Sequence, residues 1–160
     1  MLITESSRHN LTSLRDPASI EARHFAESLA FLDAIESEGA FASPAIDVGS
    51  GAGVPGIPMK IVRPELELTL LEATRKKTEF LEKAVAELGL DGVTVLHGRA
   101  EEIAHGAAHR EHYALAVAKA VAPLRVLAEL AMPFLSHKSA GRHERVPRCV
   151  RSVGCVQSPT

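Results

Sequence analysis

Residues 45–56 read AIDVGSGAGVPG, and this stretch decides the fold. A short apolar run contains an aspartate, four glycines follow within eight residues, and Pro55 stands where a helix can begin. Glycine lets the backbone turn sharply and come close to a ligand. The pattern therefore predicts a strand over residues 45–49, a glycine-rich turn and a short helix over residues 55–62.

The flanking sequence predicts an α/β fold. Its apolar periods alternate between strand and helix, which is typical of a mostly parallel sheet with helices on both faces. The predicted elements are strands at 66–72, 93–97 and 113–121, and helices at about 75–88 and 123–135. Upstream, a helix from Asp16 is expected to present one apolar face made of Ile20, Phe25, Leu29, Leu32 and Ile35.

Composition narrows the class of protein. The 160 residues, 46% hydrophobic and 24% charged, suit one globular domain, and no apolar run approaches the roughly 20 residues of a membrane span. With no secretory signal in MLITESSRHN, we expect a soluble, cytoplasmic monomer without membrane contact. Cys149 and Cys155 lack partners at zinc-ligand spacing, so neither a metal site nor a disulfide framework is expected.

The last 25 residues change in character. Residues 136–160 hold five Lys or Arg against one Glu, and Pro147 interrupts the spacing of the arginines. A disordered basic tail is favoured over an ordered RNA-binding helix. The expected organisation is a helical segment at 1–40, a ligand-binding α/β domain at 41–135 and the tail at 136–160.

Two registers fit the glycine stretch. GAGVPG at 51–56 satisfies the GxGxxG pattern of dinucleotide binding, but its first glycine stands two residues beyond the expected strand end. DVGSGAG at 47–53 places an acid at the strand's last turn and alternating glycines after it, a form typical of S-adenosylmethionine (SAM) binding. Both an NAD and a SAM interpretation stay open at this point.

Acids after the next two strands favour a nucleoside ligand. Glu72 ends a strand 23 residues after Gly49, where a carboxylate can bind both ribose hydroxyls. GRAEE at 98–102 follows the next strand, where backbone and a carboxylate can meet an adenine. Each feature also has a purely structural interpretation: Asp47 as a turn cap, Glu72 as a surface acid, and Glu101 and Glu102 as an exposed helix start. Their shared place at the carboxyl ends of parallel strands favours the cofactor.

The sequence resembles a known family over residues 10–135. NLTSLRDPASIEARHF, GSGAGVPGIP joined to LLEATRKK, VLHGRAEEIAH and VAKAVAPLRVLAELAMPFL are similar to the RsmG (GidB) family of methyltransferases. The resemblance implies a Rossmann-like SAM-dependent fold. It also implies methylation of a guanine N7 in 16S rRNA, with the small ribosomal subunit as partner.

The resemblance also implies the cofactor-binding residues. It places Gly49 and Val54 against SAM, Glu72, Ala73 and Thr74 around its ribose and adenine, and Ala100 with Glu101 beside the adenine. Lys119 stands where the family has an arginine in its RAVA segment, since this chain reads KAVA. Lysine keeps the charge but lacks the planar fork of arginine.

The expected chemistry needs no catalytic acid or base. Guanine N7 offers a lone pair without deprotonation, so catalysis would rest on holding N7 and the methyl group in line. RNA contacts are expected from basic groups around the pocket: Arg8, Arg15, Arg23, His24, Arg75, Lys76, Lys77 and Lys119. For each of these residues alone, an ordinary solvated surface position is the competing interpretation.

The chain departs from the family after PFL. Similar proteins continue there into further strands, which are not evident in residues 136–160, and their helical N-terminal region is longer. We hypothesise a frameshift near codon 135, which fails if neither other reading frame resumes a strand-rich pattern. A shortened sheet is expected to expose an apolar edge. A noncatalytic SAM-binding remnant and an NAD-dependent oxidoreductase remain the alternatives.

Overall fold

A parallel sheet forms the centre of the molecule. The computed structural model describes residues 16, 18 and 21–136. Within them, four parallel strands pair in the order β3-β2-β1-β4. The strands are β1 (Ala45–Val48), β2 (Leu68–Glu72), β3 (Val93–His97) and β4 (Leu115–Val117). The predicted parallel α/β architecture is confirmed.

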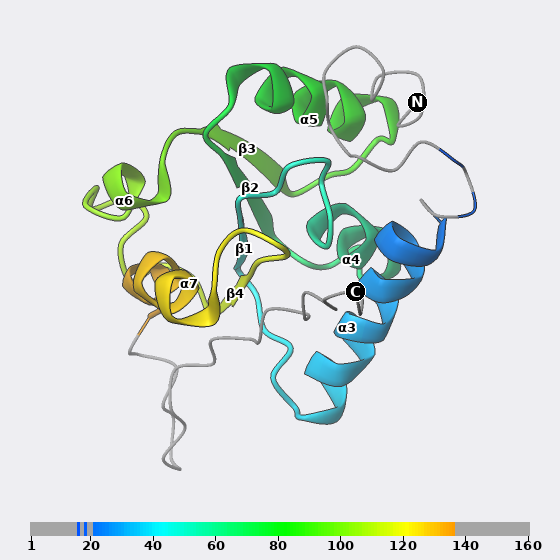
Figure 1. Ribbon diagram of the computed structural model, residues 1–160, viewed down its shortest axis with the longest axis horizontal. Coiled ribbons are helices and arrows are strands. Elements are labelled where there is room, and N and C mark those ends of the chain that lie inside the picture. The colour runs from blue at the N-terminus through cyan, green and yellow to red at the C-terminus, as the bar shows by residue number, and fades with distance from the viewer. Residues whose placement is uncertain (1–15, 17, 19–20, 137–160) are drawn as a thin grey trace, which may run out of the picture.

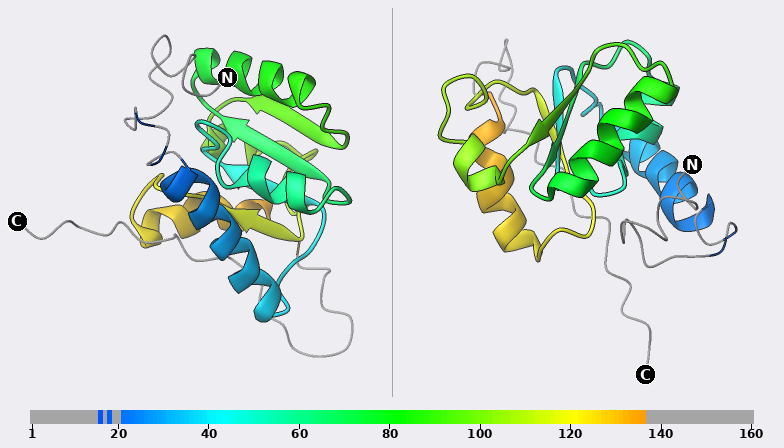
Figure 2. Two further views of the ribbon diagram at one scale, coloured as in Figure 1. Left: turned by 90° about the vertical axis from the view of Figure 1, so that its right-hand side faces the viewer. Right: turned by 90° about the horizontal axis from the view of Figure 1, so that it is seen from above.

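Helices cover both faces of this sheet (Figures 1 and 2). One face carries α3 (Glu27–Ser37), preceded by the π-helical turn η1 (Glu21–Ala26), together with α4 (Gly56–Val62) and α5 (Arg75–Glu87). The other face carries α6 (Ala100–Ile103) and α7 (Leu124–Ala131), which continues into the 3₁₀ turn η2 (Met132–Phe134). Every residue of β1 is buried because both faces of the strand are covered.

Side chains of the strands alternate between two cores. Ala45 of β1 belongs to a core with Phe31 and Leu32 of α3, whereas Ile46 and Val48 belong to a core with Leu127 of α7. The side chain of Asp47, which alternates with Ile46 and Val48, therefore points to the α3 and α4 face. Such alternation decides which helices a polar strand residue can reach.

The predicted apolar face of the first helix is partly wrong. Phe25 and Leu29 are 40% and 38% exposed, whereas Ser28 and Phe31 are buried together with the correctly predicted Leu32 and Ile35. The chain is π-helical over η1, and its wider turns break the 3.6-residue period on which the prediction rests. Ile20 lies outside the described residues.

Two elements near the end differ from prediction in their boundaries. The fourth strand spans 115–117 instead of 113–121, because the backbone turns away soon afterwards, with Ala120 in the left-handed region at φ 57°. The last helix ends at Ala131, and the turn that follows contains Pro133, which has no N–H to continue α-helical bonding. Residues 100–103 form α6, and exposed Glu101 and Glu102 lie in its first turn, in agreement with the helix-start interpretation.

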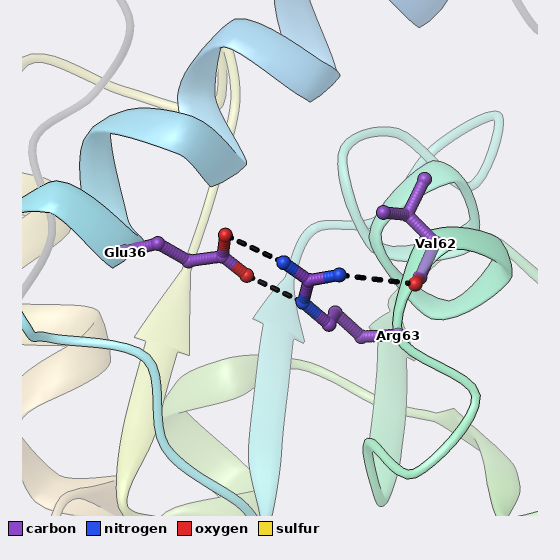
Figure 3. Close-up of polar contacts among 3 residues, drawn as sticks. All are labelled: Glu36, Val62 and Arg63. Carbon is purple, nitrogen blue, oxygen red and sulfur yellow. Dashed lines mark hydrogen bonds and ion pairs between the residues drawn. The ribbon is translucent and has the colours of Figure 1, made fainter.

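An ion pair joins α3 to α4 at the amino-terminal edge of the sheet. Arg63, directly after α4, donates from Nε and Nη2 to the two carboxylate oxygens of Glu36, at 2.5 and 2.7 Å (Figure 3). Its Nη1 donates to the carbonyl oxygen of Val62 at 3.4 Å. Hydrogen bonding to Glu36 raises the pKa of Arg63 above its ordinary value. This forked contact ties the last turn of α3 to the end of α4.

Some predictions fall beyond the described chain. The predicted basic tail spans 136–160, and Ser136 is its only described residue. The proposed division at residues 40 and 135 therefore stays a prediction. β4 stands at one edge of the described sheet, as expected for a short sheet, but its side chains are buried. No helix among the residues described is long and apolar enough to cross a membrane.

Two leucines of α3 test the corrected helix face. Leu32 is 1% exposed and Leu29 is 38% exposed. We expect Leu32→Ala to lower the free energy of unfolding by about 2–5 kcal/mol, because it leaves a cavity in the core. Leu29→Ala should cost less than about 1 kcal/mol. Urea unfolding of both variants checks this, and equally large losses for Leu29→Ala and Leu32→Ala would support the face predicted from sequence.

Candidate functional site

The glycine loop, residues 49–56, leaves β1 at the carboxyl end of the sheet. Gly49, Gly51 and Gly53 have φ values of 74°, 56° and 86°, a region that other residues rarely adopt. The N–H groups of Gly49 and Ser50 both donate to the carbonyl oxygen of Leu71, at 2.8 and 3.0 Å. The loop is therefore anchored to the end of β2 before it turns back toward α4.

Asp47, on β1, supports the glycine loop. Its side chain is fully buried, and Oδ2 accepts the N–H of Gly56, the first residue of α4, at 3.0 Å. Its Oδ1 is buried without a hydrogen-bond partner among the described residues. Burial raises the pKa of Asp47 to about 7, the N–H of Gly56 opposes this rise, and the negative charge of Glu72 adds to it. The turn-cap interpretation of Asp47 agrees with this geometry.

Glu72 supports the loop from the neighbouring strand. It is 6% exposed, so its interpretation as a surface acid is wrong. Its Oε2 accepts the N–H of Gly51 at 3.0 Å, and its Oε1 accepts the N–H of Thr74 at 2.8 Å. Each carboxylate oxygen has a further lone pair, so ligand hydroxyl groups can still bind.

Of the loop glycines, Gly51 has the most open surroundings. A Cβ atom there would meet only the carbonyl oxygen of Gly49, at 3.8 Å. At Gly53 the same atom would lie 2.4 Å from Ile57, and at Gly56 it would lie 2.7 Å from Asp47 Oδ2. Gly53 and Gly56 therefore serve internal packing, whereas Gly51 leaves space at the loop that a ligand can enter.

The ends of β2 and β3 continue this edge. The N–H of Gly98, directly after β3, donates to the carbonyl oxygen of Glu72 at 3.0 Å. Ala73 and Thr74 are exposed beyond β2. Ala100 is buried in the α6 and α7 core, and Glu101 is exposed in the first turn of α6. The edge thus holds the predicted residues of β2 and β3 together with the loop, in which Val54 is half-buried.

Lys119 forms an ion pair with a residue of α3. Following β4, its Nζ lies 2.8 Å from Oε2 of Glu27 in the first turn of α3. Two residues later, the side chain of Val121 approaches within 2.7 Å of the position that a Cβ would take on Gly49. The segment after β4 therefore crosses from α3 to the glycine loop.

Sequence reasoning missed three contributors: Gly56, Val121 and Glu27. Gly56 had a usable signal, because a glycine after Pro55 at a helix start suggests close backbone packing. Val121 was assigned to the fourth strand, so its contact with Gly49 was hidden by that error. Glu27 is 92 residues from Lys119, and no local pattern indicates such a pair.

A separate cavity of about 380 Å³ lies at the opposite end of the sheet. Residues 67–69 and 92–94, where β2 and β3 begin, line it together with His109, His112 and Tyr113. Burial raises the pKa of Tyr113, whose hydroxyl donates to Thr69. Among the described residues no group of three His, Cys, Asp or Glu is placed to hold a metal ion.

Asp47 predicts a pH-dependent stability. Its pKa of about 7, against an ordinary 3.8, means that the folded chain keeps a proton that the unfolded chain releases. Stability linked to Asp47 is therefore complete below about pH 4 and falls up to about pH 7, by at most about 1.4 kcal/mol per pH unit.

Asp47→Asn isolates this effect, because asparagine keeps an acceptor for Gly56 but does not titrate. We expect the stability of the wild-type chain relative to the variant to fall between about pH 4 and about pH 7 in urea unfolding. Parallel curves for the two proteins across that range would show that Asp47 is ionised in the folded chain.

Comparisons with known proteins agree on one family. The family model GidB, described as rRNA small subunit methyltransferase G, matches residues 1–141. Proteins named ribosomal RNA small subunit methyltransferase G are similar to the chain. The one from Alkaliphilus metalliredigens is 43% identical over 137 residues, covering 84% of this chain and 56% of that protein. The one from Deinococcus radiodurans is 45% identical over 135 residues, covering 84% and 53%.

Solved structures support the fold. A putative S-adenosyl-L-methionine-dependent methyltransferase from Methanococcus maripaludis matches with a TM-score of 0.57 at 18% identity, over 73% of this chain and 55% of that one. The YcgJ protein from Bacillus subtilis matches with a TM-score of 0.54 at 17% identity, over 69% and 47%. The chain spans about half the length of the curated relatives it matches. By its sequence and its Rossmann-like fold, the chain belongs to the GidB family, rRNA small subunit methyltransferase G.

Proposed function

We propose that this chain carries the cofactor-binding part of a SAM-dependent methyltransferase that acts on a guanine N7 of 16S rRNA in the small ribosomal subunit. One observation carries the proposal: in a chain of the GidB family, the glycine loop is fixed by two buried carboxylates at the ends of β1 and β2. The guanine and its N7 rest on the family resemblance.

The residues at this edge fit SAM chemically. Gly51 offers half-buried backbone beside open space, and Glu72 offers carboxylate lone pairs for ribose hydroxyl groups. In this proposal Gly49 and Val54 contact the cofactor from the loop, and Ala73 and Thr74 contact it from the end of β2. Ala100 and Glu101 bind on the β3 side, and Lys119 borders the pocket at the end of β4.

Bound SAM supplies an activated methyl group on a sulfonium. The chain's task is then to hold the cofactor rigidly, so that a guanine N7 approaches in line with little entropy left to lose. Guanine N7 is neutral and needs no proton removed. The proposed mechanism therefore assigns no general base to Asp47 or Glu72, and both carboxylates act by fixing the loop.

A basic cluster favours a polyanionic substrate. Arg75, Lys76 and Lys77 occupy the first turn of α5, directly after residues 72–74. Positive side chains at a helix N-terminus oppose the helix dipole, so the interaction with the dipole does not explain the cluster. Arg75 and Lys76 are exposed, and Lys77 is half-buried. Phosphates of RNA would gain from this charge beside the cofactor.

Two other functions are kept for testing. A noncatalytic SAM-binding module would use the same loop without methyl transfer. An NAD-dependent oxidoreductase is disfavoured, because Gly51, the first glycine of the GxGxxG register, stands three residues after β1 ends at Val48, whereas Gly49 of the GSGAG register follows the strand directly.

Matched glycine variants test the cofactor. Gly51 and Gly89 both have positive φ and room for a methyl group, but only Gly51 lies at the proposed site. By calorimetry we expect the wild-type chain to bind SAM and not NAD. Gly51→Ala should weaken SAM binding by about tenfold or more, because its Cβ enters the ligand space, and Gly89→Ala should not. NAD binding without SAM binding would overturn the assignment.

Charge reversals on α5 test the RNA. We expect Lys76→Glu with Lys77→Glu to weaken RNA binding and flatten its salt dependence, because phosphate contacts are lost, while SAM affinity is kept. Lys83→Glu makes the same kind of change further along α5, beside Glu87, as a control. Labelled methyl transfer to small subunits measures activity. SAM binding without any transfer would favour the noncatalytic module, and equal RNA effects from Lys83→Glu would remove the special role of the cluster.

A further inference from the structure

We propose that the ion pair between Glu27 and Lys119 is a positioning device for the cofactor pocket. The pair holds the segment after β4 between α3 and the glycine loop, so that Val121 lies against Gly49. The inference rests on the proposed function, because the segment after β4 that the pair holds borders the proposed SAM site. Lys119 and Glu27 then act as positioning residues.

The pair is more enclosed than an ordinary surface contact. The Lys119 side chain is 14% exposed and that of Glu27 is 44% exposed, whereas Arg75 and Glu79, which also form an ion pair, are 79% and 61% exposed. Exposed pairs contribute little because water and salt screen them. Partial burial strengthens the attraction of the first pair and makes loss of one partner costly.

The backbone beside Lys119 needs such an anchor. Ala120 has a φ of 57°, a left-handed conformation that is unfavourable for residues other than glycine. That conformation persists only when the surroundings hold it. The Lys119 contact with α3 holds it on one side, and the packing of Val121 against Gly49 holds it on the other.

The contact also explains why lysine suffices at position 119. The contact joins Lys119 Nζ to Glu27 Oε2 at 2.8 Å. An ammonium supplies such a contact, whereas the planar fork of arginine matters for bidentate binding. A positioning role therefore tolerates the lysine that stands where the resemblance expects arginine.

The same helix provides a matched control. Glu36, nine residues after Glu27 on α3, forms its ion pair with Arg63, and their side chains are 28% and 37% exposed. Glu36 stands in the last turn of α3, whereas Glu27 stands in the first, and Figure 3 shows Glu36 facing Arg63. Breaking either pair removes a contact of α3, but only Glu27 is joined to the segment that covers Gly49.

Hydrogen exchange of the ligand-free full chain gives the first test. We expect Glu27→Gln and Lys119→Met each to raise the amide exchange rates in residues 117–123 and 49–54 about tenfold. A change of this size is typical when one contact between coupled residues is lost and the segment opens more often. The charge-swapped double variant, Glu27→Lys with Lys119→Glu, should restore much of the protection against amide exchange. Glu36→Gln should leave both segments unchanged even if it lowers the melting temperature.

SAM affinity gives the second test. Glu27→Gln should weaken SAM binding by about fivefold to tenfold, whereas Glu36→Gln should not. The proposal is overturned if the Glu36 variant changes the loop as much as the Glu27 variant does, or if exchange stays unchanged in the Glu27 variant. A wild-type chain that does not bind SAM refutes the proposed function instead, and the exchange comparison still decides whether the pair positions the loop.

Discussion

Two buried carboxylates, on Asp47 and Glu72, hold the glycine loop from neighbouring strands. Asp47 accepts the N–H at the start of α4, and Glu72 accepts the N–H of Gly51 in the middle of the loop. These contacts depend on β1 and β2 lying side by side in register, since Asp47 pairs with Leu70 and Val48 with Leu71. The helices on both faces keep water away, which strengthens these bonds and also raises the pKa of Asp47.

Much of this architecture follows from local sequence. Apolar strand periods, the glycine loop and the helix after Glu72 were all predicted within a few residues, because each element is buried in a simple periodic way. The position of Glu72 at a strand end also followed from spacing. Its bond to the loop did not, because the carboxylate of Glu72 meets the backbone N–H of Gly51 only once the strands pair.

Predictions failed where a local pattern competes with tertiary packing. Phe25 and Leu29 follow a helical period but lie largely outside the core, because the π-helical turn rotates the following helix. Val121 looks like strand sequence, yet the left-handed Ala120 turns it onto Gly49. The ion pair of Lys119 with Glu27 could not be predicted either, because it depends on how α3 crosses the sheet. Long-range contacts of this kind leave no mark in sequence spacing.

Residue-resolved amide exchange in the ligand-free chain tests the central claim most directly. If the two carboxylates hold a preformed loop, the Gly51 and Gly56 amides exchange slowly, and each depends on its own acceptor. Glu72→Ala should then speed exchange at Gly51 more than at Gly56, and Asp47→Ala should do the reverse. Exchange at both glycines near the rate of an unfolded peptide in the wild-type chain would contradict the account, because the loop would then lack its support.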